Sequence, residues 1–154
     1  MSKPSSLFSE AFPPLLILAF ALSLGAGCAS PTGSQSVASP VGVRENDLLV
    51  LGQKDQNRTA EVRVGERFAV RLAENPTTGF TWAVAESDGR LLTLERTDYA
   101  PPEETGFIGV WGDRTFTFTA REAGEVPLAL KYWRFWEGDA SIAQRYTVTV
   151  RIVP

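Results

Sequence analysis

Apolar and polar residues alternate along most of the chain from residue 45 to residue 154. This period of two predicts β-strands with one buried face and one solvent-facing side. No window of helical length shows a convincing 3.6-residue period, so we expect an all-β domain. The apolar positions of the stripes are Ala60, Val62 and Val64; Phe68, Val70 and Leu72; Phe80, Trp82 and Val84; Phe116 and Phe118; Val126, Leu128, Leu130 and Tyr132; and Tyr146, Val148, Val150 and Ile152.

Glycine-containing turn signals separate these segments, at 64–66, 87–89 and 123–125. Several short strands with a turn at roughly every 8–12 residues are typical of an antiparallel β-sandwich. A domain of this size can bury a workable core without disulfides. The expected strands cover 67–73, 80–85, 91–96 with a less regular continuation over 97–107, 115–120, 126–133 and 143–153.

If successive strands run in opposite directions, three connections meet at one pole of the sandwich. They are 75–79, 109–112 and 134–138, and each contains glycine. Two of them carry a tryptophan, Trp111 or Trp136, that lies outside the alternating stripes, whereas Trp82 is in phase with its strand and is expected in the core. Loops displayed at one end of a sandwich are a recurrent binding geometry.

The first of these loops reads Asn75-Pro76-Thr77-Thr78-Gly79-Phe80. Proline fixes its own φ and favours an extended residue before it. Gly79 can adopt a positive φ without steric cost. Asparagine and threonine side chains can bond to nearby backbone and hold a turn. We therefore expect a stiff loop with a shape of its own.

Composition excludes several kinds of chemistry. The 154 residues contain no histidine, so a Ser-His-Asp triad, a Cys-His pair and His-ligated zinc are not available. One cysteine allows neither an intramolecular disulfide nor a Cys-rich metal site. The net charge is −3 and no basic stripe is present, so no nucleic-acid partner is expected. We expect neither a metal nor a cofactor.

The three loops, in this order, resemble those of the chagasin-type inhibitors of papain-like cysteine proteases, and the resemblance covers residues 48–153. The NPTTGF string of that family is intact at 75–80. The second loop of the family is usually Gly-x-Gly-Gly and here reads Gly109-Val110-Trp111-Gly112. The third is usually Arg-Pro-Trp followed by a glycine and here reads Arg134-Phe135-Trp136-Glu137-Gly138. The Phe135 departure removes a φ constraint, and Trp111 adds bulk that could fill a protease subsite or narrow the range of targets.

The resemblance implies an immunoglobulin-like fold and a reversible, tight-binding inhibitor that is not an enzyme. It implies that the three loops enter the active-site cleft, with Thr77 and Thr78 nearest the catalytic cysteine of the protease. Trp136 would then be an apolar anchor, and Arg134 could orient it or pair with an acidic rim. The implied protease-binding residues are Asn75, Pro76, Thr77, Thr78, Gly79, Phe80, Gly109, Val110, Trp111, Gly112, Arg134, Phe135 and Trp136.

Two other functions stay open on the sequence. The same loops could serve a non-inhibitory, surface-tethered module that binds a peptide, a glycan or an envelope partner. Alternatively, Glu103, Glu104 and Asp113 could in principle form the acid/base pair of an enzyme, although solvated loop charges are the simpler interpretation.

The N-terminal part resembles a bacterial lipoprotein signal. An apolar run at 15–24 suits a signal-peptide core, and small residues lead to the lone Cys28. Leu24 lies four residues before the cysteine, where this class usually has leucine three before it. We expect a signal peptide over 1–27, lipid on Cys28, a flexible Ser/Pro/Gly-rich tether over 28–44 and a monomeric inhibitor domain over 45–154. The resemblance implies an exported envelope lipoprotein of the outer membrane. An ordinary secreted protein cut near Cys28 is the alternative.

Overall fold

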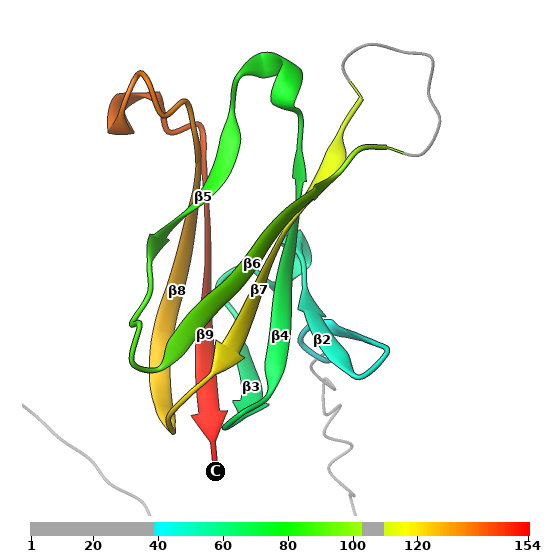
Figure 1. Cartoon of the computed structure of the whole chain (residues 1–154), viewed down its shortest axis with the longest axis vertical. Coiled ribbons are helices and arrows are strands. Elements are labelled where there is room, and N and C mark those ends of the chain that lie inside the picture. The colour runs from blue at the N-terminus through cyan, green and yellow to red at the C-terminus, as the bar shows by residue number, and fades with distance from the viewer. Residues whose placement is uncertain (1–38, 103–109) are drawn as a thin grey trace, which may run out of the picture. The chain divides into compact units, whose positions relative to one another are not determined.

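The computed structural model describes residues 39–102 and 110–154. Within these ranges the chain forms two β-sheets that pack face to face (Figure 1). The strands are β1 Val43–Glu45, β2 Leu48–Leu51, β3 Thr59–Arg63, β4 Arg67–Glu74, β5 Thr81–Glu86, β6 Leu92–Ala100, β7 Gly112–Ala120, β8 Gly124–Trp133 and β9 Gln144–Val153. Three short 3-10 helices join them: η1 Gln53–Asp55, η2 Pro76–Thr78 and η3 Asp139–Ser141.

One sheet has the strand order β1-β2-β4-β7-β6 and the other has the order β3-β9-β8-β5. The pairs built from the stripes predicted in the sequence, β4/β7, β6/β7, β5/β8 and β8/β9, are antiparallel. This confirms the predicted sandwich. Two pairs are parallel, β2/β4 and β3/β9. Each of these pairs contains a strand, β2 or β3, that precedes the first of the three loops.

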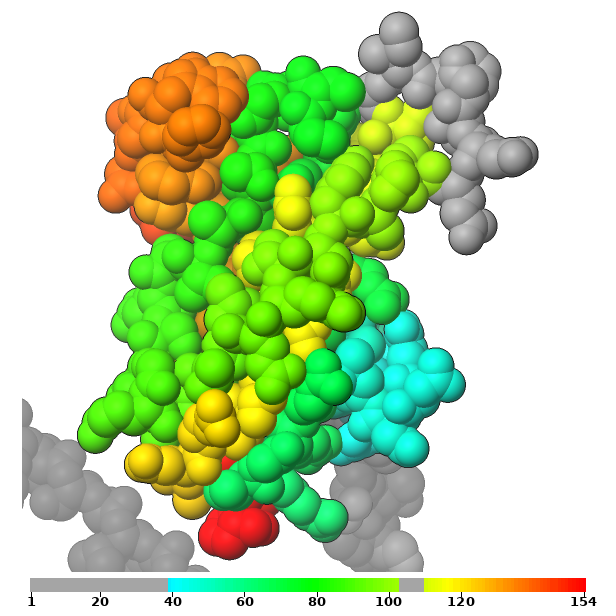
Figure 2. All heavy atoms as spheres, in the orientation of Figure 1, coloured from blue at the N-terminus to red at the C-terminus, as the bar shows by residue number. Residues whose placement is uncertain are grey.

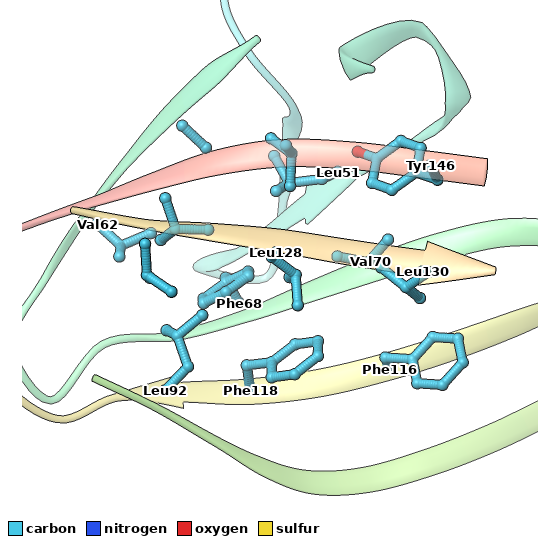
Figure 3. Close-up of a cluster of buried hydrophobic side chains, with 14 of the residues drawn as sticks. Leu51, Val62, Phe68, Val70, Leu92, Phe116, Phe118, Leu128, Leu130 and Tyr146 are labelled. Carbon is cyan, nitrogen blue, oxygen red and sulfur yellow. The ribbon is translucent and has the colours of Figure 1, made fainter. Parts of the chain in front are cut away.

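The predicted stripes form the core between the two sheets. Phe68, Val70, Phe118 and Leu128 lie with other apolar side chains in one cluster (Figure 3). The rings of Phe68 and Phe118 stack with their centroids 5.4 Å apart. Val64 departs from the predicted stripe because β3 ends one residue before it, and its side chain is exposed.

The strand expected at 91–96 continues to Ala100 as β6, with an irregularity between Leu94 and Arg96. β6 is an edge strand and most of its residues are exposed. An edge strand with little buried surface has little need of apolar alternation, which explains why the pattern weakens here.

Residues 41–44, which the sequence analysis assigned to the tether, take part in the fold. Val41 packs against the core, and Val43 begins β1. The backbone N–H of Gly42 donates to the fully buried Asp55 carboxylate at 2.9 Å. Cys28 and the expected signal peptide lie outside the described residues. Over the described ranges, no helix is long and apolar enough to cross a membrane.

The strand directions bring the ends that carry the three predicted loops to one pole. The β4–β5 connection, the β8–β9 connection and the adjoining ends of β6 and β7 all lie at the upper end of Figure 1. The plainer turns, β3–β4, β5–β6 and β7–β8, lie at the opposite pole (Figure 1).

Candidate functional site

The first loop, residues 75–80, is a compact turn stabilised by its own side chains. The Asn75 side chain accepts hydrogen bonds from the Thr77 backbone N–H at 3.1 Å and from the Thr77 hydroxyl at 2.7 Å. The Thr78 hydroxyl donates to the Asn75 carbonyl at 2.7 Å. These are the local side-chain-to-backbone bonds expected from the sequence, and they cap the single turn of η2.

Both ends of this turn have the backbone geometry that the sequence predicted. Asn75, before the proline, is extended with φ −116° and ψ 96°. Gly79 has φ +78°, in the left-handed region, and its N–H donates to the Pro76 carbonyl at 3.1 Å. The side chains of Pro76, Thr77 and Thr78 are exposed at the tip of the turn. The first loop therefore presents a rigid polar tip to solvent.

The third loop, residues 134–138, is bonded directly to the first. The Arg134 guanidinium donates from Nε and Nη2 to the Thr78 carbonyl, at 3.3 and 3.2 Å. Its Cζ lies 4.4 Å from the centroid of the Phe80 ring, and its Nη1 pairs with Glu137 at 3.1 Å. Arg134 thus binds its own protein in three ways and holds the two loops together. Green and orange surfaces, the first and third loops, meet at the top of Figure 2.

Trp136 and Phe135 form an exposed aromatic surface on the third loop. Trp136 is 58% exposed and Phe135 is 68% exposed, and their rings meet edge-on with centroids 5.0 Å apart.

Gly138 has φ +72° and ends the third loop, where its carbonyl accepts a hydrogen bond from the Ser141 N–H at 3.0 Å. Lys131 donates to Asp139 at 2.6 Å, and this hydrogen bond lowers the pKa of Asp139. Hydrogen bonds hold this loop although it has phenylalanine where a proline would fix φ.

The second loop is described in part. Gly109 lies outside the described residues, Val110 is partly buried, and Trp111 is 51% exposed with its ring centroid 6.4 Å from that of Tyr132. Gly112 is the first residue of β7 and is buried. A Cβ at Gly112 would lie 2.3 Å from the Ala100 carbonyl oxygen. Glycine is required here because β6 and β7 approach closely.

Tyr132 links all three loops, a role that its place in an apolar stripe did not indicate. Its ring stacks on Phe80 with centroids 5.3 Å apart and also contacts Trp82 and Trp111. Its hydroxyl accepts from the Asn75 backbone N–H at 3.2 Å. One side chain from β8 therefore supports the first loop, contacts the aromatic residue of the second, and stands two residues before Arg134 of the third.

Glu74 and Arg114 were also missed by sequence reasoning. Glu74 is completely buried at the end of β4 and forms an ion pair with Arg114 of β7, with Oε1 and Nη2 2.5 Å apart. A signal was present, since Glu74 continues the stripe of Phe68, Val70 and Leu72 at the same period. A carboxylate at a core position implies a buried partner.

The three candidates for acid/base chemistry are not brought together in the described part of the chain. Asp113 is exposed, while Glu103 and Glu104 lie outside the described residues. In the part of the chain that the structure covers, no group of three or more Cys, Asp or Glu side chains is placed to hold a metal ion. What the described geometry offers is a binding surface, with a rigid turn between exposed aromatic side chains. Fold and site together define a β-sandwich protein that displays loops with exposed aromatic side chains at one pole.

Comparisons with known proteins agree with this class. The model of the chagasin family peptidase inhibitor I42 matches residues 61–150. Chagasin from Trypanosoma cruzi is 33% identical over 97 residues, which cover 60% of this chain and 87% of chagasin. Amoebiasin-1 from Entamoeba histolytica is 29% identical over 104 residues, which cover 68% of this chain and 99% of that protein.

Two solved structures share the fold. The crystal structure of a cysteine protease inhibitor from Entamoeba histolytica superposes with a TM-score of 0.62 at 24% identity, covering 68% of this chain and 95% of the other. The solution structure of Amebosin superposes with a TM-score of 0.57 at 28% identity, covering 68% and 96%. This chain belongs to the chagasin family of peptidase inhibitors, which confirms the resemblance seen in its loops. The family consists of inhibitors and not of enzymes.

Proposed function

We propose that this protein inhibits papain-like cysteine proteases by placing its three loops across the active-site cleft, with Thr77 and Thr78 closest to the catalytic cysteine. The observation that carries the proposal is the bond between the first and third loops, in which Arg134 holds the Thr78 carbonyl. A surface assembled from two joined loops is already in its binding shape. It therefore loses little conformational entropy when it docks.

The geometry of the tip should also make the first loop resistant to cleavage by the protease. Pro76, Thr77 and Thr78 form one turn of 3-10 helix and not an extended strand. Nucleophilic attack requires a carbonyl held in line with the catalytic cysteine at close range. A helical turn whose Pro76 and Thr78 carbonyls accept hydrogen bonds within the inhibitor does not offer an extended peptide bond in that position, so the loop can occupy the cleft without being cut.

The exposed aromatic residues supply the binding energy in this proposal. Trp136, Phe135 and Trp111 are large, lose few rotamers on burial, and stand outside the core. Such residues are typical hot spots when they enter apolar pockets of a partner. Because the contacts come from one pole of one domain, we propose a monomer that binds one protease molecule.

The direct test is titration of active-site-calibrated papain with the chain that begins at Ala29. Stoichiometric, reversible inhibition with an inhibition constant below about 1 μM supports the proposal, and it should be lost in part with Trp136→Ala. Absence of inhibition of papain and other papain-like proteases at micromolar concentration would favour the alternative, a tethered module that binds a peptide, a glycan or an envelope partner without inhibiting.

We also propose that the inhibitor is exported and held at the outer membrane, on its periplasmic or surface side, by lipid on Cys28. The apolar run and the small residues that precede this lone cysteine support it. Cys28→Ser should leave the protein unprocessed or release it into the soluble fraction. A processed Cys28→Ser protein that still partitions with membranes would contradict the anchor.

A further inference from the structure

We propose that Glu74 and Arg114 act as a positioning pair. The pair fixes the orientation of the first loop relative to β6 and β7, the strands that flank the second loop, and so determines inhibitory affinity. The proposal rests on the inhibitory function proposed above. It assigns a role to two residues that lie outside all three loops. Neither would be chosen as a protease contact, because one is fully buried and the other lies mostly beneath the surface.

Glu74 fixes both ends of the first loop. It is the last residue of β4, directly before Asn75. Its Oε2 accepts hydrogen bonds from the backbone N–H of Trp82 at 2.8 Å and from the Thr81 hydroxyl at 3.1 Å. Thr81 and Trp82 begin β5, on the other side of the loop and in the other sheet. One carboxylate therefore holds together the strand that enters the loop and the strand that leaves it.

Arg114 connects this carboxylate to the second loop. Its Nε lies 3.2 and 3.1 Å from the two carboxylate oxygens, and its Nη2 lies 2.5 Å from Oε1. Its guanidinium carbon lies 5.2 Å from the centre of the Tyr99 ring on β6. Tyr99 in turn closes over Gly112, where a Cβ would come within 2.6 Å of the Tyr99 hydroxyl. The pair thus spans β4, β5, β6 and β7 immediately below the loops.

The chemistry of the pair favours orientation over stability. A buried ion pair must offset a large desolvation cost, so its net contribution to folding is often near zero. A two-pronged contact from a planar guanidinium to a carboxylate is, however, strongly directional. At this position direction matters, because a small rotation at the end of β4 would shift the exposed tip at Thr77 and Thr78 relative to a protease cleft.

Tyr132 holds the same loop from the other side. Its hydroxyl bonds to the backbone of Asn75, one residue beyond Glu74. Two consecutive residues are therefore fixed by two different elements, Glu74 by β7 and Asn75 by β8. The turn itself is stabilised by Asn75 and Thr78. Loss of the ion pair should then loosen the loop, so that its turn opens more often while the rest of the domain stays folded.

The test compares Glu74→Gln, Arg114→Met and the double variant with the parent, each as the chain that begins at Ala29. Glutamine keeps the shape of Glu74 and an oxygen to accept from Trp82, but it removes the charge. Arg67→Met is the matched control: Arg67 begins the same strand β4 and pairs with Glu95 of β6, but the pair is exposed and lies at the other pole. Thermal unfolding first shows the temperature range in which every variant is folded. Inhibition constants for papain are then measured within that range.

We expect the inhibition constant to rise at least about tenfold for Glu74→Gln and for Arg114→Met, and less than about twofold for Arg67→Met. The double variant should lose little more than either single variant, because both remove the same contact. Since Glu74 has no exposed surface, its effect cannot come from a lost contact with the protease.

Amide hydrogen exchange of the free inhibitor gives a readout that does not depend on any protease. The Thr77, Thr78 and Gly79 amides, which bond within the turn, should exchange faster in both single variants, while that of Val70 in the centre of β4 stays as in the parent. Unchanged loop exchange together with unchanged inhibition constants in folded variants would overturn the proposal. A parent that inhibits no protease would refute the proposed function, and the exchange rates would still decide whether the pair positions the loop.

Discussion

The indole of Trp136 lies directly over Gly79, so that a Cβ built on Gly79 would be 2.7 Å from Cη2 and 3.0 Å from Cζ2 of the tryptophan. Glycine meets two needs at this position. It accepts φ +78°, and it leaves room for the aromatic ring of another loop. The position of the exposed indole in the third loop therefore depends on the absence of a side chain in the first.

Gly79→Ala should weaken inhibition more than Pro76→Ala. Alanine at Gly79 is strained by its positive φ and also displaces Trp136, whereas alanine at Pro76 only frees a backbone angle, at a cost of about 1 kcal/mol or less. Gly65→Ala is the matched control, because Gly65 has φ +82° but nothing within 4 Å of a built Cβ. It should lower stability by about 1 kcal/mol and leave inhibition unchanged. Inhibition constants and unfolding midpoints of the three variants check this, and equal inhibition by Gly79→Ala and the parent would contradict it.

The two tryptophans Trp82 and Trp136 should separate folding from binding. Trp82 is buried, and its indole N–H donates to the Ala73 carbonyl at 2.9 Å. Trp82→Ala should lower the free energy of unfolding by about 3–5 kcal/mol. Trp136→Ala should leave unfolding nearly unchanged and weaken binding by at least about 2 kcal/mol. Urea unfolding and inhibition assays on both variants measure the two quantities. If Trp136→Ala inhibited every susceptible protease as well as the parent, the three-loop arrangement would be the wrong model of binding.

A chain that begins at Glu45 should be less stable than one that begins at Ser39. The shorter chain loses Val41 from the core and the Gly42 N–H that donates to the buried Asp55 carboxylate. Leaving a buried charge with one donor fewer costs about 1–3 kcal/mol. The sequence alone placed the boundary at Glu45, and the contacts of Val41 and Gly42 move the expected boundary toward residue 39. Identical urea midpoints for the two chains would restore the boundary at Glu45.

Tyr146→Phe should not destabilise the protein near neutral pH. The Tyr146 hydroxyl is buried in the core (Figure 3), and in the described part of the chain it has no hydrogen-bond partner. Burial, followed by the charge of Asp55, raises the pKa of Tyr146. Because the pKa is higher in the folded state than in the unfolded state, this phenol has no pH-dependent effect on stability below pH ~10, and its ionisation lowers the free energy of unfolding as the pH rises further. Tyr146→Phe should therefore unfold at higher alkaline pH than the parent, and a lower alkaline midpoint would show a hidden bond to the hydroxyl.

Much of this fold could be predicted from the sequence, because each strand with one buried face shows the same alternation of apolar and polar residues. Each stripe, such as Phe68, Val70 and Leu72, needed only its own alternation to be recognised as a strand with a buried face. The conformation of the first loop could also be predicted, because the hydrogen bonds of Asn75 and Thr78 join residues that are close in the sequence. What depends on neighbours in sequence was predicted well.

The meeting of the three loops at one pole was predicted, but the individual contacts between distant residues were not. The support from Tyr132, the ion pair of Glu74 with Arg114 and the bond from Arg134 to Thr78 join residues 40 to 57 positions apart. Each required the pairing register of the sheets, which alternation does not specify. The two parallel pairs were missed for the same reason, because β2 and β3 pair with strands that the pattern could not select.

The parallel pairing of β3 with β9 joins two strands that lie far apart in the sequence. Thr59 lies opposite Thr149, and within the described residues β9 is the only strand that pairs with β3. Contacts of such long sequence separation slow folding, since the entropy of closing the loop must be overcome before they form. The domain is therefore expected to complete its fold late, once β9 has paired with β3.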